Sequence, residues 1–218
     1  GVKIAALPGE TVWQAATRHG TEIPHLCHSP ELGYRPDGNC RACMVEIEGE
    51  RVLAASCIRK PTDYMVVKSA SERARNSQRM VFELLLADQA IRDQAHDGNS
   101  KFWHWAEKLE IDTSRFPRRD LPMEDLSHPA MAVNLDACIN CALCVRACRE
   151  VQVNDVIGMA ARGADAKIIF DFDDPMGDST CVACGECVQA CPTGALLPKS
   201  VMREDGPGIE SAESEIES

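Results

Sequence analysis

The chain lacks the features of several large classes of protein. Basic residues are in the minority, since 23 Lys and Arg stand against 34 Asp and Glu and the formal charge is −11. This balance argues against nucleic acid or an anionic membrane surface as a partner. No apolar run approaches the length of a membrane span, and no signal peptide opens the chain. There is no Gly-rich dinucleotide fingerprint, no P-loop and no nucleophile elbow, so we predict no catalytic residue.

Cysteine, by contrast, is abundant. The chain has 12 cysteines among its 218 residues. Because no secretory signal is present, the expected compartment is a reducing one, where disulfides are disfavoured and dense cysteine points to metal. The sequence therefore predicts a cytoplasmic metalloprotein.

The first zone, residues 1–68, is predicted to be a small β-rich domain. Its expected elements are a strand over 2–6, a helix over 11–19 with Thr11 as N-cap, a hairpin of 44–48 and 51–56, and a strand over 64–68. Strand, helix and hairpin in this order suit a half-open sheet that grips one helix.

The second zone, residues 69–128, is predicted to be mainly helical. Apolar residues recur at helical spacing from Met80 to Ile91. A second short helix is expected to begin at Phe102 and to end before Phe116. The zone closes with a charged connector that contains proline.

The third zone, residues 129–203, contains two cysteine runs that resemble each other, which indicates an internal duplication. The remaining tail, 204–218, has six acids and no base. A segment of this composition cannot bury enough apolar surface to order itself, so we expect the tail to be disordered.

The two cysteine runs are the strongest chemical signal in the sequence. Each has the spacing Cys-x2-Cys-x2-Cys-x3-Cys, and a proline follows the last cysteine of the second run. Two-residue gaps allow three thiolates of one loop to converge on an iron–sulfur cube. The fourth cysteine, expected at the start of a helix that leads away, reaches the other cube. We therefore assign [4Fe–4S] cluster I to Cys138, Cys141, Cys144 and Cys191, and [4Fe–4S] cluster II to Cys148, Cys181, Cys184 and Cys187.

Two zinc sites are the alternative interpretation of these runs. Structural zinc usually combines one CxxC pair with a distant second pair, and three evenly spaced cysteines plus a fourth fit that pattern poorly. Two such runs in tandem, the second ending in Cys-Pro, favour iron–sulfur clusters.

Four further cysteines in the first zone predict a [2Fe–2S] cluster. Cys27, Cys40, Cys43 and Cys57 are separated by gaps of 12, 2 and 13 residues. The plant-type pattern has a shorter first gap, so this spacing is related but distinct. Zinc is again the alternative, which the cubane-type runs on the same chain disfavour. All twelve cysteines are thus predicted to be ligands, and none a nucleophile.

Four histidines are interpreted as residues other than ligands. His25 and His28 flank Cys27, but four cysteines already complete that site, so both are expected to be polar groups of a loop. His96 and His104 lie in the helical zone without a cysteine nearby. We predict that they are surface or interface residues.

The arrangement resembles the N-terminal iron–sulfur arm of the NAD-dependent formate dehydrogenase alpha subunit. It is also similar to the complex I large iron–sulfur subunit and to the small diaphorase subunit of NAD-reducing hydrogenases. The stretches that carry the resemblance are 39–49 with 54–57, 82–88 and 191–195. The resemblance covers about residues 2–203.

This resemblance implies an α+β fold. The expected parts are a β-grasp [2Fe–2S] ferredoxin-like domain at 1–68, a helical spacer at 69–128 and a two-[4Fe–4S] bacterial-ferredoxin-like domain at 129–203.

The sequence departs from the family pattern in the spacer. Most of these relatives place a [4Fe–4S] site with one histidine and three cysteine ligands there, in the pattern HxxxCxxCxxxxxC. His96 is followed by no cysteine as far as Trp105. We therefore expect that cluster to be absent and the segment Phe102–Trp105 to fill its space. Electrons would then pass directly from the [2Fe–2S] domain to a cubane, or through a cluster of a partner.

These observations predict an electron-transfer module with one [2Fe–2S] and two [4Fe–4S] clusters and no substrate site of its own. By resemblance, the parent enzyme is an NAD-dependent formate dehydrogenase. Its implied partners are a flavin/NAD-binding diaphorase subunit and a molybdenum- or tungsten-pterin catalytic domain or subunit.

Three alternatives are kept. The diaphorase iron–sulfur subunit of an NAD-reducing hydrogenase is naturally a chain of about this length, but it would carry the histidine-ligated site. A succinate dehydrogenase-type iron–sulfur subunit would carry a different set of clusters. A zinc-stapled structural scaffold would be colourless, whereas a relay module would be brown.

Overall fold

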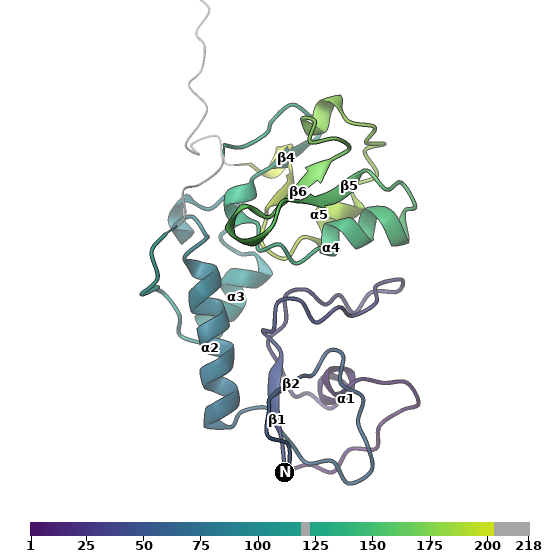
Figure 1. Ribbon diagram of the computed structural model, residues 1–218, viewed down its shortest axis with the longest axis vertical. Helices are drawn as coiled ribbons and strands as arrows, with labels where there is room; N and C mark the ends of the chain where they lie inside the picture. The colour runs from purple at the N-terminus through teal and green to yellow at the C-terminus, as the bar shows by residue number, and fades with distance from the viewer. Residues whose placement is uncertain (119–122, 203–218) are drawn as a thin grey trace, which may run out of the picture.

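The computed structural model describes residues 1–118 and 123–202. Figure 1 shows the N-terminal and C-terminal regions one above the other, with the helices of the intervening sequence along one side of both. The expected disordered tail, 204–218, lies outside the described residues, as does a short part of the connector. Within the described ranges, no helix is long and apolar enough to cross a membrane.

The first helix, α1 (Val12–Arg18), forms where the sequence predicts it. The Thr11 hydroxyl accepts a hydrogen bond from the Gln14 N–H at 3.3 Å, and the Gln14 side chain accepts one from the Thr11 N–H at 2.8 Å. This reciprocal capping box satisfies two N–H groups that the helix leaves unpaired.

The predicted hairpin is confirmed, although its strands are short. β1 (Met44–Ile47) pairs antiparallel with β2 (Ala54–Ala55) and with β3 (Val67–Lys68), which gives the strand order β2-β1-β3. Val45 and Ile47 are buried while their neighbours in β1 are half exposed, as the two-residue period of a strand requires.

Helix α1 covers the inner face of this sheet. Val12 and Trp13 of the helix share a core with Ile23, Val45 and Ala55. The Trp13 indole N–H donates to the Ile23 carbonyl at 3.2 Å, so burial of this ring leaves its polar atom satisfied. The half-open sheet gripping one helix is thus the observed fold of this region.

The strand predicted over residues 2–6 is wrong. These residues have no regular secondary structure, and Val2 is 80% exposed. Alternating apolar residues form a strand only where a neighbour accepts their hydrogen bonds and covers their apolar face, and the described structure provides neither here. The strand predicted over 64–68 is observed only as β3. Tyr64 cannot belong to it, because this residue adopts a left-handed φ of 60° and its side chain is fully exposed.

The spacer contains two helices, α2 (Glu72–Leu86) and α3 (Lys101–Lys108). The Ser71 hydroxyl caps α2 by accepting the Ala74 N–H. Phe82 of α2 stacks on Phe102 of α3 with ring centroids 5.6 Å apart, and both rings are fully buried. The apolar spacing that continues to Ile91 does not extend the helix, which ends at Leu86.

The third region is built from two strand pairs and two short helices. Its elements are β4 (Met131–Val133), α4 (Leu143–Arg146), β5 (Ile157–Ala160), β6 (Lys167–Phe170), α5 (Glu186–Ala190) and β7 (Leu196–Pro198). A wider helical turn, Ala147–Val151, continues α4. β4 pairs antiparallel with β7, and β5 with β6.

Single turns of 3-10 helix occur in the spacer and in the third region. They are η1 (Arg92–Gln94), η2 (Leu135–Ala137), η4 (Gly163–Asp165), η5 (Met176–Asp178) and η6 (Lys199–Val201). The β4–β7 pair ties the beginning of the third region to its end, and therefore holds both cysteine runs within one fold.

The Phe82–Phe102 stack predicts where the spacer is most sensitive to substitution. Phe102→Ala should destabilise the protein by about 3–5 kcal/mol, because it removes a buried ring and leaves a cavity between α2 and α3. Leu84→Ala, at a position on α2 that is 47% exposed, is the control and should cost much less. The measurement is urea unfolding of the anaerobic protein, and equal losses for the two variants would contradict this packing.

Candidate metal centres

The four cysteines of the first region lie against one another. The Cys27 N–H donates to the Cys40 sulfur and the Cys40 N–H donates to the Cys27 sulfur, both at 3.4 Å. The Cys40 and Cys57 thiols hydrogen-bond to Cys27 and hold its pKa far below the usual range, and Cys57 also reaches Cys43. Four cysteine sulfurs gathered in this way are the donor set that a [2Fe–2S] cluster requires.

The hairpin positions two of these sulfurs. Cys43 directly precedes β1 and Cys57 closely follows β2. The Ser56 N–H and hydroxyl both donate to the Cys43 carbonyl, at 3.1 and 2.8 Å, which ties the two strand ends together. Gly38 has a φ of +67°, and a Cβ there would come within 3.0 Å of the Ile58 side chain, so the loop leading into the cysteines requires glycine.

The eight cysteines of the third region line two separate cavities. One cavity is lined by Cys138, Cys141, Cys144 and Cys191, and the other by Cys148, Cys181, Cys184 and Cys187. Each cavity therefore has three cysteines from one run and one from the other.

The two runs share a strained backbone conformation, as expected of an internal duplication. The residue before the second cysteine, Asn140 or Ala183, has a φ of 52° or 56°. The residue after it, Ala142 or Gly185, has a φ of 58° or 79°. Left-handed conformations at residues other than glycine are uncommon and cluster at functional sites. They turn the Asn140 and Ala183 N–H groups onto the sulfurs of Cys138 and Cys181, both at 3.4 Å.

The expected position of the fourth cysteine, at the start of a helix, is wrong. Cys148 lies in the turn that continues α4, and Cys191 is the residue at which α5 ends. The helix instead begins one residue before the third cysteine of each run, and the three-residue gap places the fourth one turn further along. Pro192 lacks an N–H and so ends α5. Each helix consequently lies between the two cavities and contributes one cysteine to each.

Burial controls the protonation of these thiols. It raises the pKa of Cys141 and Cys144 well above the usual range and that of Cys187 to about 12. Thiolates at these positions need a cationic partner, because the charged form is otherwise disfavoured away from water. The iron of an iron–sulfur cluster fits this requirement, and it would supply one-electron transfer. None of the twelve cysteines, all of which lie within the described residues, forms a disulfide, so the complete set can serve as ligands.

The prediction that His25 and His28 are polar groups of a loop needs correction for His28. Both rings pack edge-on against Trp13, with centroids 4.5 and 4.7 Å away. His28 is 2% exposed, and neither of its ring nitrogens has a hydrogen-bond partner among the described residues. Burial lowers the pKa of His25 to about 4 and also lowers that of His28. The His28 ring therefore acts as apolar packing beside Cys27, which alternation and charge patterns could not reveal. His25, by contrast, is a half-buried loop residue whose Nδ1 lies 3.2 Å from the Ile23 carbonyl, so for this residue the prediction of a polar loop group agrees with the structure.

The spacer segment that follows His96 is filled by packed side chains. Phe102, Trp103 and Trp105 are buried in a core with Leu26 and Phe82. His96 is half-buried, with its Nε2 3.5 Å from a Glu124 carboxylate oxygen. His104, by contrast, is exposed, in agreement with its interpretation as a surface residue.

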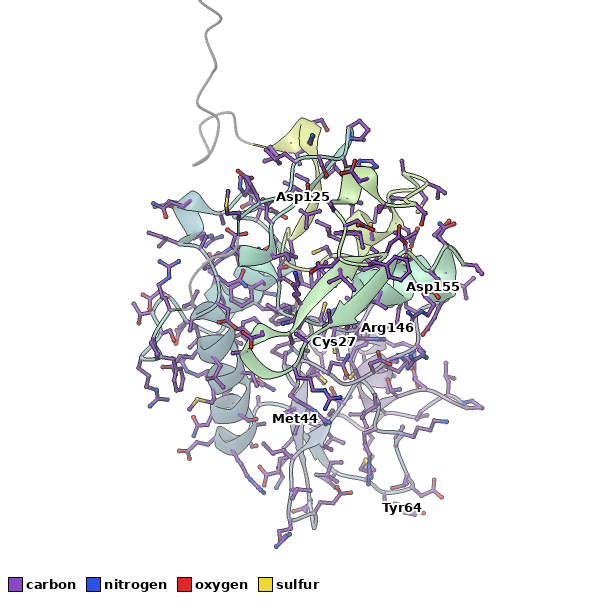
Figure 2. The ribbon with its side chains drawn as sticks, turned by 45° about the horizontal axis from the view of Figure 1, so that its top comes forward. Cys27, Met44, Tyr64, Asp125, Arg146 and Asp155 are labelled. Carbon is purple, nitrogen blue, oxygen red and sulfur yellow. The ribbon has the colours of Figure 1, made fainter. Side chains whose placement is uncertain are left out.

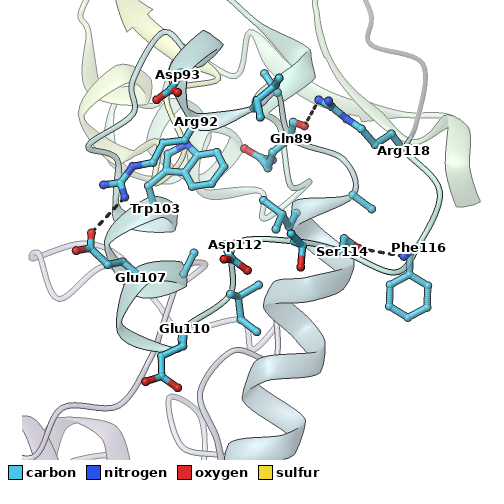
Figure 3. Close-up of a pocket in the computed structure, with 17 residues that line it drawn as sticks. Gln89, Arg92, Asp93, Trp103, Glu107, Glu110, Asp112, Ser114, Phe116 and Arg118 are labelled. Atoms are coloured by element: carbon cyan, nitrogen blue, oxygen red, sulfur yellow. Dashed lines mark hydrogen bonds and ion pairs between the residues drawn. The ribbon is translucent and has the colours of Figure 1, made fainter.

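A cavity of about 590 Å³ lies apart from all twelve cysteines, between the end of α2 and α3 (Figure 3). Its floor includes Trp103, and the Arg92 guanidinium lies over that ring and donates to Glu107 at 3.2 Å. Arg118 donates to the Gln89 carbonyl at another wall. No sequence motif marks this cavity, because its lining comes from the ends of elements rather than from one run of residues.

Comparison with known proteins agrees with these features. A model of a 2Fe-2S iron-sulfur cluster binding domain matches residues 1–72, and a model of a 4Fe-4S dicluster domain matches residues 131–195. The NADP-reducing hydrogenase subunit HndD of Solidesulfovibrio fructosivorans is 35% identical over 204 residues, which are 89% of this chain and 34% of that protein. The putative formate dehydrogenase YrhE of Bacillus subtilis is 30% identical over 94% of this chain and 21% of that protein.

A solved structure gives the same result. A chain of the NAD⁺-reducing [NiFe]-hydrogenase in the H₂-reduced state superposes with a TM-score of 0.83 at 30% identity, over 92% of this chain and 86% of that chain. The fold is thus a 2Fe-2S domain followed by a 4Fe-4S dicluster domain. The chain belongs to the iron–sulfur family whose members include NADH-quinone oxidoreductase, formate dehydrogenase-like and NAD-reducing hydrogenase proteins.

This finding confirms the predicted resemblance and disfavours a zinc-stapled scaffold. The chain is an iron–sulfur electron-transfer module of the kind found in NAD-linked oxidoreductases. It spans about a third or less of the length of the curated relatives that it matches.

The cysteine-rich core predicts that metal and folding are coupled. Cys144, Cys148 and Cys187 belong to the same buried core as Val156 and Ile157. Because the free energy of binding iron–sulfur clusters to these cysteines also stabilises the folded state, removal of iron with a chelator should largely unfold the third region. Hydrogen exchange should show loss of amide protection in β4 and β7, while a mock-treated sample keeps it. Full protection after removal would contradict this coupling.

Proposed function

We propose that the chain is the electron-relay module of an NAD-dependent formate dehydrogenase. In this function it carries one [2Fe–2S] and two [4Fe–4S] clusters in the cytoplasm, where thiols stay reduced. The [2Fe–2S] ligands are Cys27, Cys40, Cys43 and Cys57; those of cluster I are Cys138, Cys141, Cys144 and Cys191; those of cluster II are Cys148, Cys181, Cys184 and Cys187.

A continuous series of contacts between the three cysteine sets is the observation that supports this function best. Cys27 shares a buried contact cluster with Cys141 and Leu143. Helices α4 and α5, each together with the residues that directly follow it, then contribute one cysteine to each cavity of the third region. The chain's own residues therefore hold the three sites side by side, and they exclude water from most of the sulfurs.

The two ends of this series differ in exposure, which suits contact with different partners. Cys184 and Val182 beside it are exposed, so the second cavity of the third region lies near the surface. We place a molybdenum- or tungsten-pterin domain or subunit on the cubane side and a flavin/NAD-binding diaphorase subunit on the [2Fe–2S] side. Formate oxidation to carbon dioxide releases a pair of electrons and a proton, and reduction of NAD⁺ to NADH accepts an electron pair with a proton. The relay transmits the pair one electron at a time.

A hydrogenase diaphorase subunit is the second candidate. The observation that favours it is the solved hydrogenase chain, of which this chain covers 86% at a TM-score of 0.83. Relatives named as putative formate dehydrogenases match at comparable identity, the Bacillus subtilis protein YrhE at 30%. Both candidates use the same three cysteine sets and differ in the catalytic partner.

The metal content of the native assembly discriminates between these candidates. We expect about ten irons per chain, two from the [2Fe–2S] and eight from the two [4Fe–4S] clusters, together with molybdenum or tungsten. Elemental analysis of the assembly purified without oxygen is the measurement. Nickel in place of molybdenum or tungsten would support the hydrogenase, and zinc with little iron would refute a relay of either kind.

The ligand assignment predicts that each cysteine run supplies its fourth cysteine to the cluster held by the other run. Cys191→Ala should remove about four irons and give the spectrum of Cys138→Ala, although Cys191 belongs to the second run. Cys148→Ala should likewise match Cys181→Ala. The readouts are iron content and the EPR spectrum of the reduced protein.

The control for these variants is Val182→Ala, which lies between two cysteines of the second run, is exposed and supplies no thiol. It should keep all the iron. If Cys191→Ala instead resembled Cys181→Ala, each run would hold its own cluster and the assignment would fail.

A further inference from the structure

One arginine of the first cysteine run is almost completely buried. Arg146, at the end of α4, has a side chain that is 3% exposed, although the guanidinium group is always charged and is rarely found inside a protein. Figure 2 shows it close to Cys27, between the N-terminal and C-terminal regions. A buried charge of this kind requires partners for most of its N–H groups.

The partners of Arg146 lie in both cysteine loops. Its Nη2 donates to the carbonyl of Cys27 at 2.8 Å and to the carbonyl of Cys141 at 3.4 Å. Its Nη1 donates to the Arg35 carbonyl at 2.6 Å. One guanidinium thus joins a cysteine of the first region to a cysteine of the third.

A single carboxylate balances this charge. The Asp37 carboxylate lies 3.0 Å from the Arg146 Nε. Asp37 also pairs with Arg35, whose guanidinium reaches Glu150 of the third region at 3.0 Å. The network ties the 27–37 loop to α4 and to the turn Ala147–Val151 that continues it. The two arginines and two carboxylates of the network sum to zero charge.

We propose that Arg146 is a positioning residue that fixes the Cys27 loop against the Cys141 loop, and whose charge favours an added electron on the two clusters held there. This inference rests on the proposed relay function. The planar guanidinium points Nη2 at the cysteine carbonyls while its Nη1 reaches the Arg35 carbonyl and its Nε faces Asp37. The point charge of a lysine cannot reproduce three such directions at once. Because a positive charge in a medium of low dielectric stabilises added negative charge nearby, the midpoint potentials of both clusters should depend on it.

The contrast with cluster II makes the proposal specific. Arg146 donates to four carbonyls, those of Cys27, Arg35, Cys141 and Ala142. Two of these residues are cysteines, Cys27 of the [2Fe–2S] site and Cys141 of the cluster I cavity, and Ala142 also lines that cavity. The cavity lined by Cys148 and Cys181 has no Arg146 contact among the described residues. If Arg146 only stabilised the fold, its substitution would not change the potentials of two clusters while leaving that of the third unchanged.

The test is an anaerobic redox titration of the full chain followed by EPR. Arg146→Gln should lower the midpoint potentials of the [2Fe–2S] cluster and of one [4Fe–4S] cluster and leave the other [4Fe–4S] cluster unchanged. Asp37→Asn, which removes the balancing negative charge, should shift the same two potentials upward. Arg146→Lys should keep the potentials near those of the unaltered protein. It should nevertheless weaken the magnetic interaction between the two reduced clusters, measured by microwave power saturation, because the fork is lost.

Arg75→Gln is the matched control, since it removes an exposed arginine of α2 and should change none of the three potentials. Unchanged potentials in both Arg146→Gln and Asp37→Asn, or equal shifts of all three clusters, would overturn the proposal. If Arg146→Gln does not assemble, the Asp37→Asn shift and the Arg146→Lys saturation behaviour decide it. Absence of [2Fe–2S] and [4Fe–4S] signals from the unaltered chain would instead refute the proposed function itself.

Discussion

The convergence of cysteine sulfurs from distant parts of the chain is the constraint on which the rest of the structure depends. A loop that brings three sulfurs to one cavity cannot follow ordinary backbone geometry, and the left-handed residues Asn140, Ala142 and Ala183 show how this chain solves the problem. The same conformations direct backbone N–H groups onto the sulfurs, so the strained turns also satisfy the polar atoms that they bury. Strand pairs, helices and the spacer hold these loops in place.

Regular secondary structure in this protein is correspondingly short and serves to anchor the loops. The β4–β7 pair closes the third region, and the β1–β2 hairpin ends at Cys43 and near Cys57. The spacer is attached to the cysteine-rich region by hydrogen bonds to backbone carbonyls. The Phe102 N–H of α3 donates to the Pro192 carbonyl at 3.0 Å, and the side-chain amide of Gln89, just after α2, donates to the Ala137 carbonyl at 3.1 Å. The aromatic core of α2 and α3 is therefore continuous with the loops around Cys138 and Cys191, rather than a separate folding unit.

Sequence patterns could predict those parts of the structure in which local chemistry decides. The cap that Thr11 and Gln14 form on α1 depends on residues only three apart, and CxxC spacing limits where three sulfurs can go. The patterns failed where a partner distant in sequence decides. Residues 2–6 alternate but have no neighbouring strand, and the continuation of α4 and α5 past the third cysteine reverses the expected position of the fourth. His28 is buried because Trp13 covers it. The position of Arg146 between two loops more than a hundred residues apart follows from tertiary packing alone, which no local pattern encodes.

The exchange of one cysteine between the two runs imposes an order on biosynthesis. All four sulfurs of the first region exist once Cys57 has been synthesised, so that site can be completed early. The cavity lined by Cys138, Cys141 and Cys144 stays one sulfur short until Cys191 emerges, after all four cysteines of the other cavity have been made. The cavity whose first three sulfurs are made earlier is consequently the later one to be completed, and both cysteine sets become complete only near the end of the third region.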